Sequence, residues 1–380
     1  MNRKTFLILL ALVALLGGSG LTLFRQDLSA WRRADAKIGS RLFAGLPVND
    51  VARIRITDGK AEVTLALKDR RWVVKQRGDY NANNQDIGDL LVKLPDVKVV
   101  QTESVGATLL PRLNLVQPGK DAQSADGLGT LLELSDTGGQ VIGSLLLGKK
   151  VTKTESSPLP IKQETPVGRY VLSPGNQSVL VISDALNKAE PKPEQWLARD
   201  FFKAERIRSL AVNGDGARWR IARGEEYGQW KFADGAGQLD PGAAVAAVNA
   251  LAALAFTDVA PDVKAESLEK PRIIIAETLD NLTYTLKLAK KSAGDDYYLS
   301  FAVGGEPPRE RKPEKGEKPA DKGRLDQQFA DTRKQLDERL KLEQGLAVWT
   351  YVVAGKTLAP LLKDRAQLSA APGKPSVPRR

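Results

Sequence analysis

Two short stretches decide the fold, "DRRWVVKQRGDY" at residues 69–80 and "YGQWKFADGAG" at residues 227–237. Each places a tryptophan in an alternating run that ends in a polar turn, and a helix-forming stretch follows each of them. Ungapped, Trp72 falls on Trp230. The repetition predicts two copies of one domain, in which each tryptophan is a buried residue that anchors a strand and has no chemical role.

The residues before each tryptophan predict two strands of a meander. Residues 51–67 and 207–223 alternate apolar and polar side chains on both sides of an Asp-Gly or Asn-Gly turn. This is the pattern of a β-hairpin. The tryptophan stretch then forms the third strand of each copy.

A helix is predicted after each third strand. In the first copy Asn83 is the expected N-cap, and Pro95 is expected to stop the helix. In the second copy Asp240 is the expected N-cap, with Pro241 as the first helical residue. The apolar stripes are Ile87, Leu90, Leu91 and Leu94 in the first helix, and Ala244, Val245, Val248, Leu251 and Leu254 in the second.

The second half of each copy also matches. Residues 131–150 align with residues 272–291 as a strand, a polar turn and a strand that ends in Lys-Lys. A last pair of strands is predicted at 168–173 and 178–183 in the first copy, and at 347–354 and 357–362 in the second. Short terminal helices are predicted within 184–189 and 360–366.

The N-terminus reads as an export or anchor signal. Arg3 and Lys4 precede nineteen uncharged residues, Phe6 to Phe24, which is enough to span a bilayer as a helix. The apolar run resumes after Gly18 and Gly20, which favours an uncleaved anchor. Cleavage as a signal peptide and secretion is the alternative. The basic residues on both sides of the run leave the orientation open by local charge.

The predicted fold class is α+β: two duplicated, mostly antiparallel sheet domains, each with a helix packed on one face, after an N-terminal transmembrane helix. Trp196, Phe201 and Phe202, between the copies, are expected to wedge between the domains. The expected divisions are an anchor at 1–25, a juxtamembrane linker at 26–45, the first domain at 46–190, a linker at 191–206, the second domain at 207–365 with a charged insertion at 306–345, and a disordered tail at 366–380.

The insertion at 306–345 breaks the symmetry of the two copies, and it is expected to occupy the place that the polar hairpin loop 150–168 has in the first copy. It holds 11 basic and 10 acidic residues, so its net charge is near zero and it is not a polyanion-binding arm. Its proline-rich first part is predicted to be disordered. Its second part predicts a charged helix with a narrow apolar stripe of Leu325, Phe329, Leu336 and Leu340. That stripe either docks a protein partner or lies on its own domain.

Composition excludes several classes of chemistry. The 380 residues include no cysteine and no histidine, which excludes thiol nucleophiles, disulfides, Cys/His zinc sites and every Ser-His-Asp triad. A general base would have to be a carboxylate, Lys or Tyr, and a metal site would need oxygen ligands only. The net charge is +11, but the basic residues are interleaved with acids, so no nucleic-acid partner is expected.

Four motifs resemble sites and are interpreted as structural. Residues 352–357, "VVAGKT", end like a phosphate-binding loop but lack its first glycine. Residues 267–270, "SLEK", match Ser-x-x-Lys without the accompanying motifs of that enzyme class. Asp295-Asp296 is expected to be a hairpin turn with an aromatic edge. Glu133 and Glu277 align between the copies and are expected to point outward from mid-strand. No catalytic, cofactor-binding or metal-binding residue is therefore predicted.

The order of these elements resembles that of a bacterial family of membrane-anchored proteins, the DUF4340 family. The resemblance rests on the strand at Trp72, "DIGDLLVKL" (86–94), "LPRLNLVQP" (110–118), "LLLGKK" (145–150) and "RYVLS" (169–173), and it covers residues 40–365. The third of these, at 110–118, lacks the Tyr-Gly that is usual in the family, since it reads "LNL" at that place. The resemblance implies a domain that faces the cell envelope, and some relatives accompany ABC-type exporters of the gliding-motility kind. It implies no known activity and offers no functional residue to carry over.

The functional hypothesis is a non-catalytic protein anchored in the bacterial inner membrane through residues 6–24, single-pass, with most of the chain in the periplasm. It would be an accessory or scaffold component of an ABC-transporter-like complex, with Leu325, Phe329, Leu336 and Leu340 as a candidate contact for protein partners. A module that binds a lipid or glycan in the cleft between the two domains is the alternative, and a carboxylate-based hydrolase is a third reading. No cofactor is expected.

Overall fold

The computed structural model describes residues 38–119, 126–155, 163–173, 178–214, 216–313 and 316–370. The predicted anchor at 6–24 lies outside these residues, as do most of the juxtamembrane linker and residues 371–380 of the tail. Within them, no helix combines the length and the apolar character that crossing a membrane requires. The chain divides into two compact units, Met1–Ala198 and Arg199–Arg380, and the division falls inside the predicted linker 191–206.

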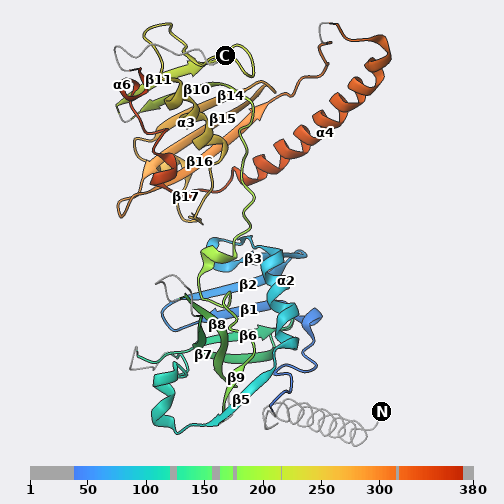
Figure 1. The fold of residues 1–380 in the computed structure, drawn as a ribbon, viewed down its shortest axis with the longest axis vertical. Coiled ribbons are helices and arrows are strands. Elements are labelled where there is room, and N and C mark those ends of the chain that lie inside the picture. Colours follow the sequence, from blue (N-terminus) through green and yellow to red (C-terminus); the bar gives the residue numbers. More distant parts are fainter. Residues whose placement is uncertain are drawn as a thin grey trace, which may run out of the picture. The chain divides into compact units, whose positions relative to one another are not determined.

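The first unit is built on a nine-stranded antiparallel sheet with the order β4-β3-β2-β1-β6-β7-β8-β9-β5. Helix α2 (Asn84–Lys93) crosses one face of this sheet (Figure 1) and buries Ile87 and Leu90. The strands are β1 (Arg53–Thr57), β2 (Glu62–Lys68), β3 (Arg71–Val74), β4 (Tyr80–Asn81), β5 (Val99–Ser104), β6 (Thr130–Ser135), β7 (Val141–Glu155), β8 (Gln163–Leu172) and β9 (Ser178–Ile182).

The second unit is built on an eight-stranded antiparallel sheet with the order β12-β11-β10-β14-β15-β16-β17-β13. Helix α3 (Pro241–Ala252) crosses one face of it (Figure 1). The strands are β10 (Ile207–Gly214), β11 (Ala217–Ala222), β12 (Lys231–Phe232), β13 (Asp258–Val259), β14 (Arg272–Thr278), β15 (Leu282–Lys290), β16 (Asp296–Gly305) and β17 (Tyr351–Ala354). Three further helices are α4 (Lys322–Leu346), α5 (Gly355–Leu358) and α6 (Arg365–Leu368).

Apart from the edge strand β4, which has no counterpart in the second sheet, the two sheets share one strand order, with β3-β2-β1-β6-β7-β8-β9-β5 matching β12-β11-β10-β14-β15-β16-β17-β13. Their registers agree as well. In the first unit Leu65 pairs with both Ile54 and Val74. In the second unit Ile221 pairs with Leu210 and Phe232. These side chains are all buried, so equivalent strands present equivalent positions to the two cores.

Both helix starts follow the predicted capping. The Asn83 side chain accepts hydrogen bonds from the backbone N–H groups of Gln85 and Asp86. The Asp240 side chain accepts one from Ala243 N, with Pro241 in the first turn. Each satisfies N–H groups that have no partner inside the helix. The stripe of α3 differs from the prediction, because Ala247 is buried whereas Val245 is 48% exposed.

Short 3-10 helices connect these elements, and one of them covers a second hydrophobic cluster. It spans Ala107–Leu113 and so includes the first four residues of the segment "LPRLNLVQP" at 110–118. Beneath it Leu115, Leu131, Leu146 and Val179 form a buried cluster, against which Leu110 and Leu113 pack. Since Leu131 and Leu146 alternate with Leu132 and Leu145 along β6 and β7, this part of the sheet is covered on both faces.

Three predictions about the ends of the copies are wrong. The last pair of strands in the second copy begins with β16 at residues 296–305 and not at residue 347, because Leu299, Phe301 and Val303 alternate into the core. The hairpin turn expected at Asp295-Asp296 is confirmed, since it joins β15 to β16. Residues 357–362 form no strand, since α5 and a turn follow β17. Residues 184–189 form no helix, because the Asp184 side chain accepts from Leu186 N and closes a turn.

The insertion also has a different place from the predicted one. It leaves the sheet between β16 and β17, and these strands correspond in order to β8 and β9 of the first unit. The polar segment at 150–168 lies between β7 and β8 instead, and its ends are paired strand as far as Glu155 and Gln163. The two segments are therefore not equivalent.

The linker aromatics, which were predicted to wedge between the domains, each have packing partners inside one unit. Trp196 is 1% exposed, and its backbone oxygen accepts from Asn83 N in the first unit. In the second unit the Phe201 ring contacts those of Phe256 and Tyr351. Phe202 contacts Phe301 of the same unit.

The two tryptophans that mark the repeat are only half-buried, which corrects the prediction that both lie in the core. Trp72 lies at the start of β3, and Trp230 precedes β12. The Arg223 guanidinium covers the Trp230 ring at 4.9 Å from its centroid. The buried tryptophan of the second sheet is Trp219 on β11, which is 3% exposed and donates to the Lys363 carbonyl at 2.9 Å.

We therefore expect Trp219→Ala to lower the free energy of unfolding of the second unit by about 3–5 kcal/mol, because it removes a buried ring and a hydrogen bond. Trp230→Ala should lower it by about 1 kcal/mol. Urea unfolding of both variants, followed by far-UV circular dichroism, compares the two. Equal losses would contradict the burial described above.

Candidate functional site: a long helix and its buried anchor

Helix α4 is the element that the sequence singles out for binding, and the structure forms it as predicted. It spans 25 residues, Lys322–Leu346, which corresponds to about 37 Å at ~1.5 Å per residue. Figure 1 shows α4 running away from the second sheet, which it meets near its C-terminal end. Glu343 and Leu346 are its buried residues.

The four predicted contact residues lie on α4 and are half-buried. Leu325, Phe329, Leu336 and Leu340 follow each other at spacings of four, seven and four residues. These spacings place them along one side of the helix. The side chains therefore form a stripe that is neither packed into the core nor fully open to water.

The segment before α4 explains part of this partial burial. The Arg333 guanidinium donates to the Arg309 carbonyl at 3.3 Å. Arg311 is paired with Glu317 and Asp326, with Nε to Asp326 Oδ1 at 2.9 Å. Pro307 is buried. The described residues of the proline-rich part thus lie beside the helix, and the prediction of disorder is wrong for them because these ion pairs and this burial offset the loss of conformational entropy.

The base of α4 is held by a carboxylate that is 0% exposed. Glu343 Oε1 accepts from Lys203 N at 2.9 Å, and its Oε2 lies 2.9 Å from the Tyr284 hydroxyl. Arg339, one turn earlier, places Nε 3.7 Å from Glu343 Oε1 and donates to Glu205 at 2.7 Å. Three segments far apart in the chain, around 203, 284 and 343, therefore meet at one carboxyl group.

Burial raises the pKa of Glu343 above its usual range, although the hydrogen bonds from Lys203 N and Tyr284 act in the opposite direction. Burial and the neighbouring carboxylate also raise the pKa of Tyr284. The Tyr284 hydroxyl lies 3.1 Å from the Lys203 carbonyl as well. The single Tyr284 hydroxyl proton therefore has two acceptors within reach, Glu343 Oε2 and the Lys203 carbonyl.

Beside the stripe, a groove of 470 Å³ follows α4. Its walls are Phe329, Ala330, Arg333, Lys334, Asp337, Glu338 and Lys341 of the helix, together with Arg309 of the preceding segment. Phe329 is thus shared between the stripe and the groove. The sequence pattern identified Phe329 but missed the groove, because the groove depends on where residue 309 returns against the helix.

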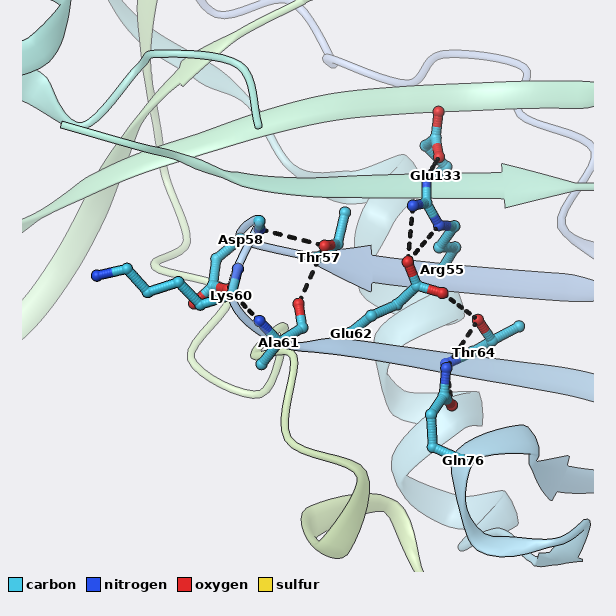
Figure 2. Close-up of polar contacts among 10 residues, drawn as sticks. Arg55, Thr57, Asp58, Lys60, Ala61, Glu62, Thr64, Gln76 and Glu133 are labelled. Carbon is cyan, nitrogen blue, oxygen red and sulfur yellow. Dashed lines mark hydrogen bonds and ion pairs between the residues drawn. The ribbon is translucent and has the colours of Figure 1, made fainter. Parts of the chain in front are cut away.

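The prediction that Glu133 and Glu277 are equivalent is wrong, because the two carboxylates occupy different positions in their sheets. Glu133 pairs with Arg55 across β6 and β1, whereas Glu277 lies opposite Ser209 on β10. Figure 2 shows Arg55 between Glu62 and Glu133, with 2.7 Å from Nη2 to Glu62 Oε2 and 2.9 Å from Nη1 to Glu133 Oε2. Glu277 accepts from Arg220 at 3.2 Å. Both point outward as predicted and form cross-strand ion pairs.

Figure 2 also shows which group accepts the hydrogen bond from β2 where its pairing with β3 ends. The Thr64 backbone N–H lies beyond the last residue of β3 that pairs with β2, so the Gln76 side-chain oxygen accepts its hydrogen bond at 2.8 Å (Figure 2). The Gln76 amide lies 3.3 Å from the Thr64 hydroxyl. The polar groups of Thr64 and Gln76 are engaged in hydrogen bonds that connect β2 to the residues after β3. We therefore assign this polar cluster a structural role.

The remaining motifs occupy structural positions. The Ser267 hydroxyl donates to the Lys264 carbonyl at 2.8 Å within a short 3-10 turn. Asp296 begins β16. Residues 352–357 form the end of β17 and the start of α5, where a side chain at Gly355 would collide with the Asp295 carbonyl. Over the described parts of the chain, no cluster of three or more acidic residues could hold a metal ion.

Glu343→Gln tests the buried anchor through pH. Because the folded-state pKa of Glu343 is raised, the folded chain binds this proton more tightly than the unfolded chain. That contribution to stability is complete below the unfolded pKa of about 4.3 and is lost as the pH rises through the folded pKa. Glutamine cannot titrate, so wild type should lose stability relative to Glu343→Gln as the pH rises from about 4 to 8.

Chemical unfolding across this pH range measures the difference in unfolding free energy. Glu338→Gln, an exposed position on the same helix, is the matched control and should give a difference that changes little with pH. A flat difference for Glu343→Gln would show that the carboxyl is not perturbed.

Comparisons with known proteins agree with the resemblance noted in the sequence. No curated protein and no solved structure matches the chain. A family described as "Domain of unknown function (DUF4340)" matches residues 72–271, from the third strand of the first unit to the start of β14. This range covers more than half of the 380 residues, and the chain therefore belongs to the DUF4340 family.

Proposed function

We propose that this protein is a non-catalytic scaffold of the bacterial envelope, whose helix α4 binds a protein partner. The apolar run at residues 6–24 anchors it in the inner membrane by a single span, and the two units lie in the periplasm. The shared strand order and register of the two sheets support an origin by internal duplication. The partner belongs to a membrane complex of the ABC-transporter-like kind.

The observation that carries the proposal is the half-buried stripe of α4. A surface helix with Leu325, Phe329, Leu336 and Leu340 at helical spacing presents the kind of face that amphipathic partners recognise. The helix is long, and only its C-terminal end is buried in the second unit. The contacts of Glu343 with Lys203 and Tyr284 fix that end, so the stripe is presented in a defined position rather than on a flexible tail.

Removal of apolar side chains from the stripe tests binding without changing the buried contacts of Glu343. Phe329→Ser with Leu336→Ser should lower recovery of the partner by at least about tenfold in a pull-down of the full-length protein from detergent-solubilised membranes, because most of the energy of such contacts comes from a few large apolar side chains. The matched control is Gln335→Ser with Gln344→Ser, at two exposed positions of the same helix, and it should recover the partner as wild type does.

Melting curves of both double variants check that the second unit stays folded. A partner recovered equally well with the Phe329→Ser and Leu336→Ser variant would reject α4 as the binding element. Loss of the partner with both variants would mean that the stripe has no special role.

The side of the membrane on which the two units lie can be tested separately. A reporter enzyme that is active only outside the cytoplasm, fused after Arg380, should be active in cells if the two units lie in the periplasm. The control is a fusion of the same reporter after Lys4, before the apolar run, which should be inactive. An inactive C-terminal fusion, with the protein present in the membrane fraction, would contradict the proposed localisation.

A further inference from the structure

The charged walls of the groove beside the stripe indicate the chemistry of the partner, which the apolar stripe alone does not. Its walls hold four basic side chains, Arg309, Arg333, Lys334 and Lys341, and two acidic ones, Asp337 and Glu338. The helix as a whole is close to neutral, with six basic and five acidic residues. The walls of the groove therefore carry a net charge of +2, whereas the other charged residues of α4, three basic and three acidic, balance each other.

Part of this charge is already balanced and part is open to a partner. Arg309 pairs with Glu306 at 2.8 Å, and Arg333 lies 3.9 Å from Asp337. Lys334 and Lys341 have no acidic group within ion-pair distance among the residues that the structure describes, and both are exposed. They are seven residues apart, which puts them on the same side of the helix two turns from each other.

The dimensions of the groove suit a peptide segment. Its helical wall runs from Phe329 to Lys341, a length of about 18 Å at ~1.5 Å per residue. That length matches about three turns of a bound helix, and Phe329 with Ala330 gives one end of the groove an apolar floor. A ligand with an apolar side chain at one end, and carboxylates about one and about three helical turns from it, would complement both Phe329 and the two lysines.

We propose that this groove binds an acidic amphipathic segment of the protein partner, with an apolar side chain on Phe329 and carboxylates on Lys334 and Lys341. This inference rests on the proposed function of α4 as the binding element and adds the chemistry of what it binds. The lysines set which partner is accepted and how fast it arrives, because charges at the rim of an interface act mainly on specificity and association rate.

Site-specific photocrosslinking in the full-length, membrane-bound protein tests the proposal. A photoreactive benzoylphenylalanine replaces Ala330 in the groove, and a second protein carries it at Gln335 on the opposite side of the helix. Irradiation of the cells, followed by purification and mass spectrometry, identifies the crosslinked segment. We expect an adduct from position 330 only, to a segment with net negative charge and apolar residues at helical spacing.

Charge variants then show whether the lysines select that segment. Lys334→Glu with Lys341→Glu should lower the adduct yield from position 330 at least about tenfold, whereas Lys334→Arg with Lys341→Arg should retain it. Lys312→Glu with Lys318→Glu makes the same change in net charge at exposed positions that do not line the groove, and it should leave the yield within about twofold. Raising the salt concentration to about 1 M during crosslinking of isolated membranes should lower the yield, since screening then acts over about 3 Å.

The outcomes separate this inference from the function on which it rests. The proposal of an acidic segment is overturned if the adduct contains a basic or neutral segment or lipid. It is also overturned if Lys334→Glu with Lys341→Glu leaves the adduct yield unchanged. If Phe329→Ser with Leu336→Ser still abolishes recovery of the partner in that case, the proposed function stands without it. No adduct from position 330, together with undiminished recovery by the serine variant, rejects both.

Discussion

The antiparallel pairing of β1 with β6, and of β10 with β14, is the constraint on which both units depend. Each pairing joins the first meander of its sheet, β1 to β4 or β10 to β12, to the later strands of the same sheet, across a crossover that contains the helix. Ile54 faces Leu134 and Ile56 faces Leu132, all of them buried. A slip of one residue would turn Arg55 and Glu133 into the core, so the register is fixed by the cost of burying charge as much as by the apolar contacts.

Much of the fold follows from local patterns in the sequence. Both hairpins with Asp-Gly or Asn-Gly turns, both helix caps, and the long helix with its stripe could be predicted, because each depends on residues close together in the chain. Residues 296–305 could not, since Asp295-Asp296 has the composition of a turn while the strand is decided by pairing with β15 and with β17 some fifty residues later. The tryptophans show the same limit. Alternation predicts which side of a strand Trp72 is on, but its burial depends on how near that residue lies to the end of the sheet.

The candidate site illustrates which part of a surface a sequence can reveal. The apolar spacing of α4 was visible, whereas Glu343 looked like one more charged residue in a charged insertion. Its burial follows from the meeting of Lys203, Tyr284 and Arg339 around it, and these lie on separate elements. A helix with so few apolar residues cannot be fixed by hydrophobic contact along its length. The buried polar junction at Glu343, together with buried Leu346, therefore fixes the C-terminal end of the helix.

The edges of the second sheet have a consequence for how this unit meets other chains. Both edge strands, β12 and β13, are only two residues long. Short edges offer few unpaired backbone groups to an incoming strand, which is one way in which sheet proteins avoid edge-to-edge aggregation. The second unit in this way keeps its backbone closed to neighbouring chains, which leaves recognition to side chains that point away from the sheet.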